Sequence, residues 1–239
     1  MGYISMIQSN LQRVYERIIN SALNVHRNPE EIRLVVVTKR QPVESIRAVI
    51  DAGARNLGEN YAEEAVTKMA LIKDTAGIEW HMIGHIQSRK AKIVCDHFSL
   101  VHSLDSFKLA ERLDFFAGEA GKVLPVLLEY NLSGEVSKSG WLANDEKQWD
   151  NLLPEINRII SFAHLRVQGL MTMPPLFDDP EFARPYFEKL RKLQDYLKAS
   201  FPDINWKELS MGTSTDYEAA IQEGATLVRI GQAILGPRL

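Results

Sequence analysis

Eight short strand-like runs alternate with stretches of helical spacing along this chain, and that alternation limits the fold more than any other feature. The runs are predicted at residues 34–37, 56–60, 80–83, 99–102, 123–129, 165–170, 208–210 and 227–230. No hairpin signal such as Asn-Gly separates them. Strands that alternate with helices build a parallel sheet, and eight repeats favour a closed (β/α)8 TIM barrel over an open doubly wound sheet.

The run from 34 to 40 is the most informative of the eight. Its four consecutive aliphatic residues, three of them β-branched, are typical of a strand buried on both faces. Lys39 follows at the carboxyl end, the edge at which parallel α/β folds carry their chemistry. A lysine there can lose solvent and attack a carbonyl as a free amine. The alternative is a surface lysine that merely follows a strand.

An additional helix is predicted ahead of the barrel. Apolar side chains recur at near-helical spacing between residues 4 and 26, and Asn28-Pro29 ends the pattern. We therefore expect residues 1–28 to form a leading helix packed on the barrel. Residues 1–239 are expected to form a single domain, because barrels of this kind commonly run to about 250 residues.

Composition and charge narrow the class of partner. The net charge of -3 gives no reason to expect nucleic acid or an anionic membrane as a partner, and no stretch approaches the roughly 18 apolar residues of a membrane span. Cys95 is the only cysteine, so no intrachain disulfide is possible. The first residues lack the apolar run of a secretory signal. The sequence thus predicts a cytoplasmic protein, expected to be a monomer, and its histidine spacing predicts no metal site.

Polar residues follow most of the predicted strands, and in a barrel these strand ends converge on one mouth. The residues expected there are Lys39, Glu59, Asn60, Gly84, His85, His102, Glu129, Asn131, Met171 to Met173, Ser210 to Ser214 and Gly231. A solvated rim has no need for so many polar groups aimed inward. The set therefore indicates a binding or catalytic site.

The loops after the seventh and eighth strands have the character of an anion site. Residues 210–216, Ser-Met-Gly-Thr-Ser-Thr-Asp, place glycine and hydroxyl groups between a strand and a helix, where backbone N–H groups and the helix dipole favour an anion. Gly231 follows the eighth strand, and barrels most often bind phosphate at these two loops. The alternative is a capping sequence, in which Ser214 or Thr215 satisfies helix donors.

Arg229 interrupts an otherwise apolar strand. An unpaired buried guanidinium is very costly, so the side chain points either outward to a carboxylate in the helix layer or inward to a ligand at the mouth. A reactive lysine after strand one, a phosphate site after strands seven and eight, and this arginine together suggest pyridoxal 5′-phosphate (PLP).

Ordered motifs cover the chain from about residue 34 to residue 236. They are Val-Thr-Lys at 37–39, Gly-Glu-Asn-Tyr at 58–61, Trp-His-Met-Ile-Gly at 80–84, Gln-Ser-Arg-Lys at 87–90, Ser-Lys-Ser-Gly at 137–140, Gly-Leu-Met at 169–171, Ser-Met-Gly-Thr-Ser at 210–214 and Val-Arg-Ile-Gly at 228–231. With these motifs the sequence resembles the pyridoxal phosphate homeostasis protein family. The chain departs from the usual residues of that family at Arg40, His85, Arg89 and Thr213.

The resemblance implies a fold like the amino-terminal barrel of alanine racemase without its β-domain. It also implies a protein that acts in intracellular PLP homeostasis, holds PLP as a lysine aldimine and catalyses little. PLP itself and PLP-dependent apoenzymes are the partners that it implies.

By that resemblance, Lys39 is the Schiff-base lysine and Asn60 lies beside the cofactor ring. Arg229 is expected to face the pyridine nitrogen, where a cation disfavours protonation of the ring and weakens its capacity as an electron sink. Lys138 is either a second cofactor contact or a loop lysine. The further cofactor-binding residues are expected to be Met211, Gly212, Thr213, Ser214, Ile230 and Gly231.

The alternative function is a PLP-dependent amino-acid racemase. A two-base racemase needs an acid or base on each face of the cofactor, and in alanine racemase one of them comes from the β-domain of a partner subunit. This chain is expected to lack that domain, so His85, His102 or Tyr61 would have to substitute for it. A Schiff-base aldolase on the same barrel would leave Arg229 unexplained.

Overall fold

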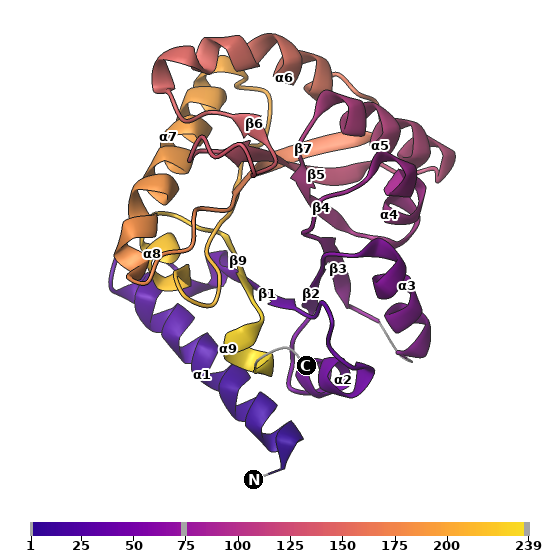
Figure 1. Ribbon diagram of the computed structural model, residues 1–239, viewed down its shortest axis with the longest axis vertical. Helices are drawn as coiled ribbons and strands as arrows, with labels where there is room; N and C mark the ends of the chain where they lie inside the picture. The colour runs from indigo at the N-terminus through magenta and orange to yellow at the C-terminus, as the bar shows by residue number, and fades with distance from the viewer. Residues whose placement is uncertain (1, 73–75, 237–239) are drawn as a thin grey trace.

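The computed structural model describes residues 2–72 and 76–236, and its strands form a closed ring (Figure 1). The strands are β1 Arg33–Val37, β2 Asn56–Glu59, β3 Glu79–Met82, β4 Leu100–Leu104, β5 Leu124–Asn131, β6 Trp141–Leu142, β7 Leu165–Thr172, β8 Glu208–Ser210 and β9 Leu227–Ile230. Parallel neighbours follow the order β4-β3-β2-β1-β9-β8-β7-β5, and β4 pairs with β5 to close the ring. The predicted (β/α)8 barrel is confirmed. The short strand β6, which extends the sheet beside the end of β5, was not predicted.

Helices cover the outside of the ring (Figure 1). The α-helices are α1 Tyr3–Leu23, α2 Val43–Asp51, α3 Ala62–Leu71, α4 Ala91–His97, α5 Phe107–Glu119, α6 Leu153–Ile160, α7 Arg184–Ser200, α8 Tyr217–Gln222 and α9 Gln232–Leu235. Four 3₁₀ helices occupy Pro29–Glu31, Ser88–Lys90, Glu146–Leu152 and Pro180–Ala183. No helix in the described part of the chain has the length and apolar character to cross a membrane.

Two α-helices are preceded by a 3₁₀ segment. The 3₁₀ helix Glu146–Leu152 leads into α6 at Leu153, and the 3₁₀ helix Pro180–Ala183 leads into α7 at Arg184. Pro154 and Pro185 lie in the first turns of α6 and α7, where a missing N–H costs nothing, whereas a position further inside would remove a hydrogen bond. The prolines therefore fix where the two α-helices begin.

The leading helix α1 is confirmed and packs on the outside of the barrel. Its apolar stripe is buried against α2, α8 and α9, and consists of Ile7, Leu11, Val14, Ile18 and Ala22. The Asn10 amide also donates to the Ile234 carbonyl, with 3.1 Å between nitrogen and oxygen. Because those three helices follow β1, β8 and β9, α1 holds the first and last repeats together (Figure 1).

The interior of the barrel is filled with side chains. An apolar cluster of Val35, Leu100, Leu127, Met171 and Leu227 lies inside the ring, separate from the larger core between strands and helices. Further along the strands the interior becomes polar, with His102, Ser210 and Arg229 buried there. Such layers make an eight-stranded barrel a packed core, and leave its carboxyl-end mouth as the place for a site.

Candidate functional site

The mouth of the barrel contains a pocket of about 370 Å³. It is lined by Val37, Lys39, Asn60, Ile83, Gly84, His85, Met173, Leu176, Thr213, Ser214, Thr215, Arg229, Gly231 and Gln232. Residues that follow strands at opposite ends of the sequence therefore meet in one cavity. Of the predicted cofactor-binding residues, Lys39, Asn60, Thr213, Ser214, Arg229 and Gly231 line it.

The other three predicted residues do not line this pocket. Met211 and Ile230 are completely buried in the core between barrel and helices. Gly212 has a φ of +91°, and a Cβ there would lie 2.6 Å from the Ala220 Cβ. Only the backbone groups of these residues are available to a ligand, and their contribution stays a prediction.

Lys68, on α3, connects two carboxylates next to the residues that follow β1. Its Nζ lies 2.8 Å from Glu59 Oε1 and 2.5 Å from Glu64 Oε1. Glu59 has 0% exposure, and its placement corrects the expectation that it faces the mouth. In β2 the inward position belongs to Gly58, so both flanking residues, Leu57 and Glu59, turn toward the helix layer.

This ion cluster holds both sequence neighbours of Lys39. The Thr38 hydroxyl donates to Glu59 Oε1 over 2.7 Å, and the Arg40 backbone N–H donates to Glu64 Oε1 over 2.7 Å. Arg40 has a φ of +57°, a left-handed conformation that costs a non-glycine residue on the order of 1 kcal/mol and persists only where surrounding contacts enforce it. The backbone on either side of Lys39 is thus fixed by side chains from β2 and α3.

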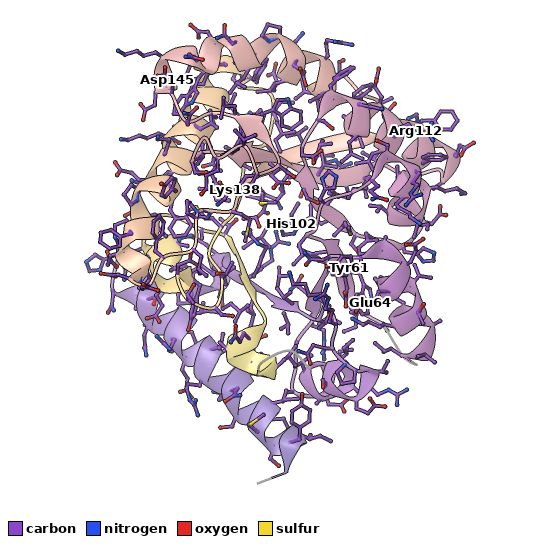
Figure 2. The ribbon with its side chains drawn as sticks, in the orientation of Figure 1. Tyr61, Glu64, His102, Arg112, Lys138 and Asp145 are labelled. Carbon is purple, nitrogen blue, oxygen red and sulfur yellow. The ribbon has the colours of Figure 1, made fainter. Side chains whose placement is uncertain are left out.

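The first turn of α3 also restrains the Arg40 side chain. Tyr61 and Glu64 lie close together there (Figure 2). The Arg40 guanidinium lies 5.5 Å from the centroid of the Tyr61 ring and donates to the Tyr61 hydroxyl over 3.2 Å. Arg40 is therefore directed to the rim beside Lys39.

Arg229 points inward, which decides between the two orientations that the sequence left open. Its guanidinium donates to Ser210 Oγ, to the Thr172 carbonyl over 3.0 Å and to the Met173 sulfur over 2.8 Å. The side chain is buried, yet it lines the mouth pocket. Burial lowers the pKa of Arg229 to about 10, so the guanidinium is still charged at neutral pH.

A chain of hydrogen bonds runs from Arg229 through the barrel interior. Ser210 Oγ lies 2.7 Å from His102 Nδ1, and His102 Nε2 lies 2.9 Å from His81 Nδ1. Figure 2 shows His102 within the ring of strands. A guanidinium only donates, so Ser210 accepts from it and gives its own proton to His102 Nδ1, and His102 then donates from Nε2 to His81. Both imidazoles are neutral in this arrangement, in agreement with the lowering of their pKa values by burial.

Two acidic groups stand at the rim of the mouth. Asp105 Oδ2 lies 2.7 Å from His85 Nδ1, and His85 lines the pocket. Glu129 is half-buried at the end of β5. Burial, reinforced by the like charge of Asp105, raises the pKa of Glu129 to about 7. The sequence placed Glu129 at the mouth but gave no sign of this perturbed carboxyl group.

The loop after β8 combines a turn with a contact to the loop after β9. The Thr213 backbone N–H and hydroxyl both donate to Asp216 Oδ1, over 2.6 and 3.0 Å. The alternative in which Ser214 or Thr215 caps the following helix is not found, because α8 has no side-chain cap; Thr213 instead forms a turn with Asp216. Ser214 Oγ accepts from the Ala233 N–H over 3.3 Å, which joins the two loops. Gly231 approaches β1 so closely that a Cβ would lie 3.0 Å from the Val37 carbonyl oxygen.

The pocket residues fit a phosphorylated aldehyde such as PLP. Within the described residues, the buried Asn60 Oδ1 has no hydrogen-bond partner, and Asn60 lines the pocket. Buried polar atoms are rarely left without a partner unless a ligand or water supplies one. Lys39 offers an amine, Arg229 a fixed cation, and Ser214 with Gly231 a small-residue wall suited to an oxyanion.

Residues 10–238 match the sequence model of the family described as alanine racemase, N-terminal domain. The chain belongs to this family. Within it, the chain is 40% identical to a pyridoxal phosphate homeostasis protein of Vibrio alginolyticus, over 98% of this chain and 99% of that relative. It is 38% identical to the protein of the same name in Escherichia coli K12, over 97% of both. The predicted resemblance to the pyridoxal phosphate homeostasis proteins is confirmed.

Solved structures of the same family give the same fold. PipY of Synechococcus elongatus, solved with PLP bound, has a TM-score of 0.80 and 33% identity, and covers 93% of this chain and 100% of its own. An alanine racemase of Clostridium difficile has a TM-score of 0.66 at 15% identity and covers 92% of this chain, but only 55% of the racemase is matched. The racemase similarity therefore concerns the barrel fold alone.

Proposed function

We propose that this protein binds PLP in the mouth pocket and serves in PLP homeostasis. The observation that carries the proposal is the convergence of Lys39, Arg229, Ser214 and Gly231 on one cavity of about 370 Å³. The names of the relatives and the PLP bound to PipY support it.

Different residues of the pocket bind different parts of the cofactor. When bound, the cofactor supplies an aldehyde that condenses with an amine and a ring that withdraws electrons. Lys39 supplies the amine, while Ser214, Gly231 and the neighbouring backbone of 211–213 and 230 bind the phosphate. Asn60 would lie beside the ring, and Arg229 would face the ring nitrogen.

The proposed role is storage and delivery rather than catalysis. A charged Arg229 disfavours protonation of the ring nitrogen, and the hydrogen-bond chain behind it keeps His102 neutral and inside the barrel. Because His102 is completely buried and both of its ring nitrogens are hydrogen-bonded, it is unsuited to replace a racemase base. We propose that the protein acts as a single-domain cytoplasmic monomer that supplies PLP-dependent apoenzymes.

Spectroscopy of the purified protein tests the binding proposal. Addition of PLP is expected to give an absorbance band at about 420 nm that is absent in Lys39→Ala. Lys138→Ala is the matched control, because Lys138 donates to the Met173 carbonyl in the neighbouring loop and does not line this pocket. Borohydride reduction followed by mass spectrometry is expected to place the adduct on Lys39. A band that survives in Lys39→Ala contradicts the assignment.

Chiral analysis tests the absence of substantial catalysis. The PLP-loaded protein incubated with L-alanine is expected to give no appreciable D-alanine. Sustained turnover that is lost in Lys39→Ala would instead establish a racemase.

A further inference from the structure

A second pocket, of about 330 Å³, adjoins the mouth pocket. It is lined by Glu129, Tyr130, Asn131, Lys138, Ser139, Met173 and Pro174. Met173 lines both pockets, and its sulfur lies 2.8 Å from Arg229 Nη2. Met173, an unbranched and adaptable residue, therefore forms part of the wall of both cavities.

Glu129 is the acidic group of this second pocket. It shares the inward face of β5 with Leu127, two residues earlier, which belongs to the apolar cluster inside the barrel. Among the described residues, none donates a hydrogen bond to its carboxylate or pairs with it, although it is half-buried. Its oxygens are not among the fully buried atoms without a partner, so the carboxylate is open to the second pocket and can accept a hydrogen bond from a ligand there.

The backbone of Gly140 packs directly against Glu129. This glycine has a φ of +98°, and a Cβ there would lie 3.0 Å from Glu129 Cγ and 2.6 Å from its carbonyl oxygen. A larger residue would press on the carboxyl side chain and strain the backbone. The glycine of the Ser-Lys-Ser-Gly motif therefore lets this loop pack against Glu129 without displacing its side chain.

Charged groups surround Glu129 from several elements. Asp105, after β4, raises its pKa, whereas Arg229, on β9, and His85, after β3, oppose that effect. Lys138 lines the same pocket from the loop between β5 and β6, and its Nζ lies 3.2 Å from Glu135 and 2.8 Å from the Met173 carbonyl oxygen. The carboxyl group thus lies among cations and one like charge, beside a cavity.

We propose that Glu129 is a general base that accepts a proton from the ammonium group of an amino acid in the second pocket, so that this amine replaces Lys39 on the cofactor. The inference rests on the proposed function and names the class of compound that releases the cofactor. An ammonium ion has no lone pair, and must lose a proton before its nitrogen can attack. Lys138, on the same pocket, suits the carboxylate of that amino acid.

The exchange balances without a further reactant. The incoming nitrogen forms a bond to the carbon that Lys39 holds, and the bond from that carbon to Lys39 breaks. The linkage carries one proton on its nitrogen before and after the exchange, so two of the three hydrogens of the incoming ammonium pass to Lys39, which is released as an ammonium, and Glu129 carries the first of them. The cofactor then leaves the protein attached to the amino acid.

The test compares Glu129→Gln, which keeps the shape of the side chain, with the wild type and with Glu135→Gln. Glu135 lies in the adjoining loop, and its substitution removes the same charge without removing the proposed base. Equilibrium dialysis first measures PLP loading of each protein. Release on addition of L-alanine is then followed from the shift of the cofactor absorbance band, between about pH 5 and pH 9.

The wild type and Glu135→Gln are expected to release the cofactor faster as the pH rises through about 7, the pKa of Glu129. Glu129→Gln is expected to load equally but to release on the order of 10²-fold more slowly, without that inflection. Titration of the Glu129 carboxyl group by carbon-13 NMR in the protein without cofactor is expected to give the same midpoint. Equal release by all three proteins, or a midpoint near 4, overturns the inference. Failure of the wild type to load PLP overturns the proposed function itself.

Discussion

Substitution of Lys68 by methionine isolates the contribution of the buried ion cluster beside Lys39. The change keeps most of the aliphatic volume and removes the charge that Glu59 and Glu64 share. Glu59 has 0% exposure, so its carboxylate would be left in the interior without its cation. Removal of one partner of a buried pair typically destabilises a protein by about 3–5 kcal/mol.

The loss is expected to depend on pH, and the sign follows from Glu59. Burial already raises the pKa of Glu59, while Lys68 lowers it, so the substitution raises that pKa further. A carboxyl group with a raised folded-state pKa favours folding while it is protonated, and this stability is lost as the pH rises through that pKa. Lys68→Met is therefore expected to lose more stability at about pH 8 than at about pH 5.

Urea unfolding at the two pH values measures this effect as a change in the free energy of unfolding. Lys92→Met is the matched control, because it breaks the exposed Lys92–Asp96 pair, for which about 0.5 kcal/mol or less is expected. The double variant Glu59→Gln with Lys68→Met is expected to recover part of the stability, since no buried charge remains. A loss below about 1 kcal/mol for Lys68→Met, or an equal loss at both pH values, refutes the reasoning.

Two further substitutions test the packing that supports the mouth. Ile18→Ala, in the stripe that joins α1 to the barrel, is expected to cost about 2–5 kcal/mol in urea unfolding, whereas Ile19→Ala, on the exposed face of the same helix, is expected to cost much less. Gly212→Ala is expected to lower the melting temperature and weaken phosphate retention, because the new Cβ would lie 2.6 Å from the Ala220 Cβ at a φ of +91°. Gly77→Ala is the control, because Gly77 also has a positive φ, +76°, but has open space where the Cβ would lie. It therefore measures backbone strain without a collision. Equal decreases in melting temperature for the two glycine variants contradict this explanation.

The sequence was sufficient for the barrel because each strand carries its own local signal. Apolar runs bounded by helical stretches locate the strands, and even Pro125 inside β5 is explained by the register. It precedes the first β4–β5 pair, Val101↔Val126, so the missing N–H costs no bond in that ladder. The sequence missed β6 and α9, since elements of two and four residues are too short to show a period.

The orientation of Arg229 depended on information that strand periodicity does not contain. Leu227 shares one face of β9 with Arg229, while Val228 and Ile230 share the other, and both faces are apolar. Nothing local says which face points into the ring. The partners that decide it, Ser210 and Thr172, come from other strands, 19 and 57 residues away.

The turn between Thr213 and Asp216, in contrast, was not predicted, since the sequence suggested Ser214 or Thr215 as helix caps. Asp216 is the residue that precedes α8, so the hydrogen bonds from Thr213 to Asp216 close a turn ahead of the helix. The structure shows this local interaction in place while Ser214, the next residue, connects to the loop after β9. Ser214 therefore joins the two loops at the pocket and does not cap α8.

Glu59 and Glu129 show that a shift of one residue along a strand decides whether a carboxylate faces the helix layer or the barrel interior. Both lie at the carboxyl end of a barrel strand, but Glu59 follows the inward Gly58 and turns outward, whereas Glu129 lies on the inward face with Leu127. The outward position meets Lys68 from α3, so its charge is neutralised and used to hold the backbone around Lys39. Glu129, at the inward position, borders a cavity, and burial raises its pKa to about 7. A one-residue shift of either strand would exchange these environments, and with them the chemistry of the two groups.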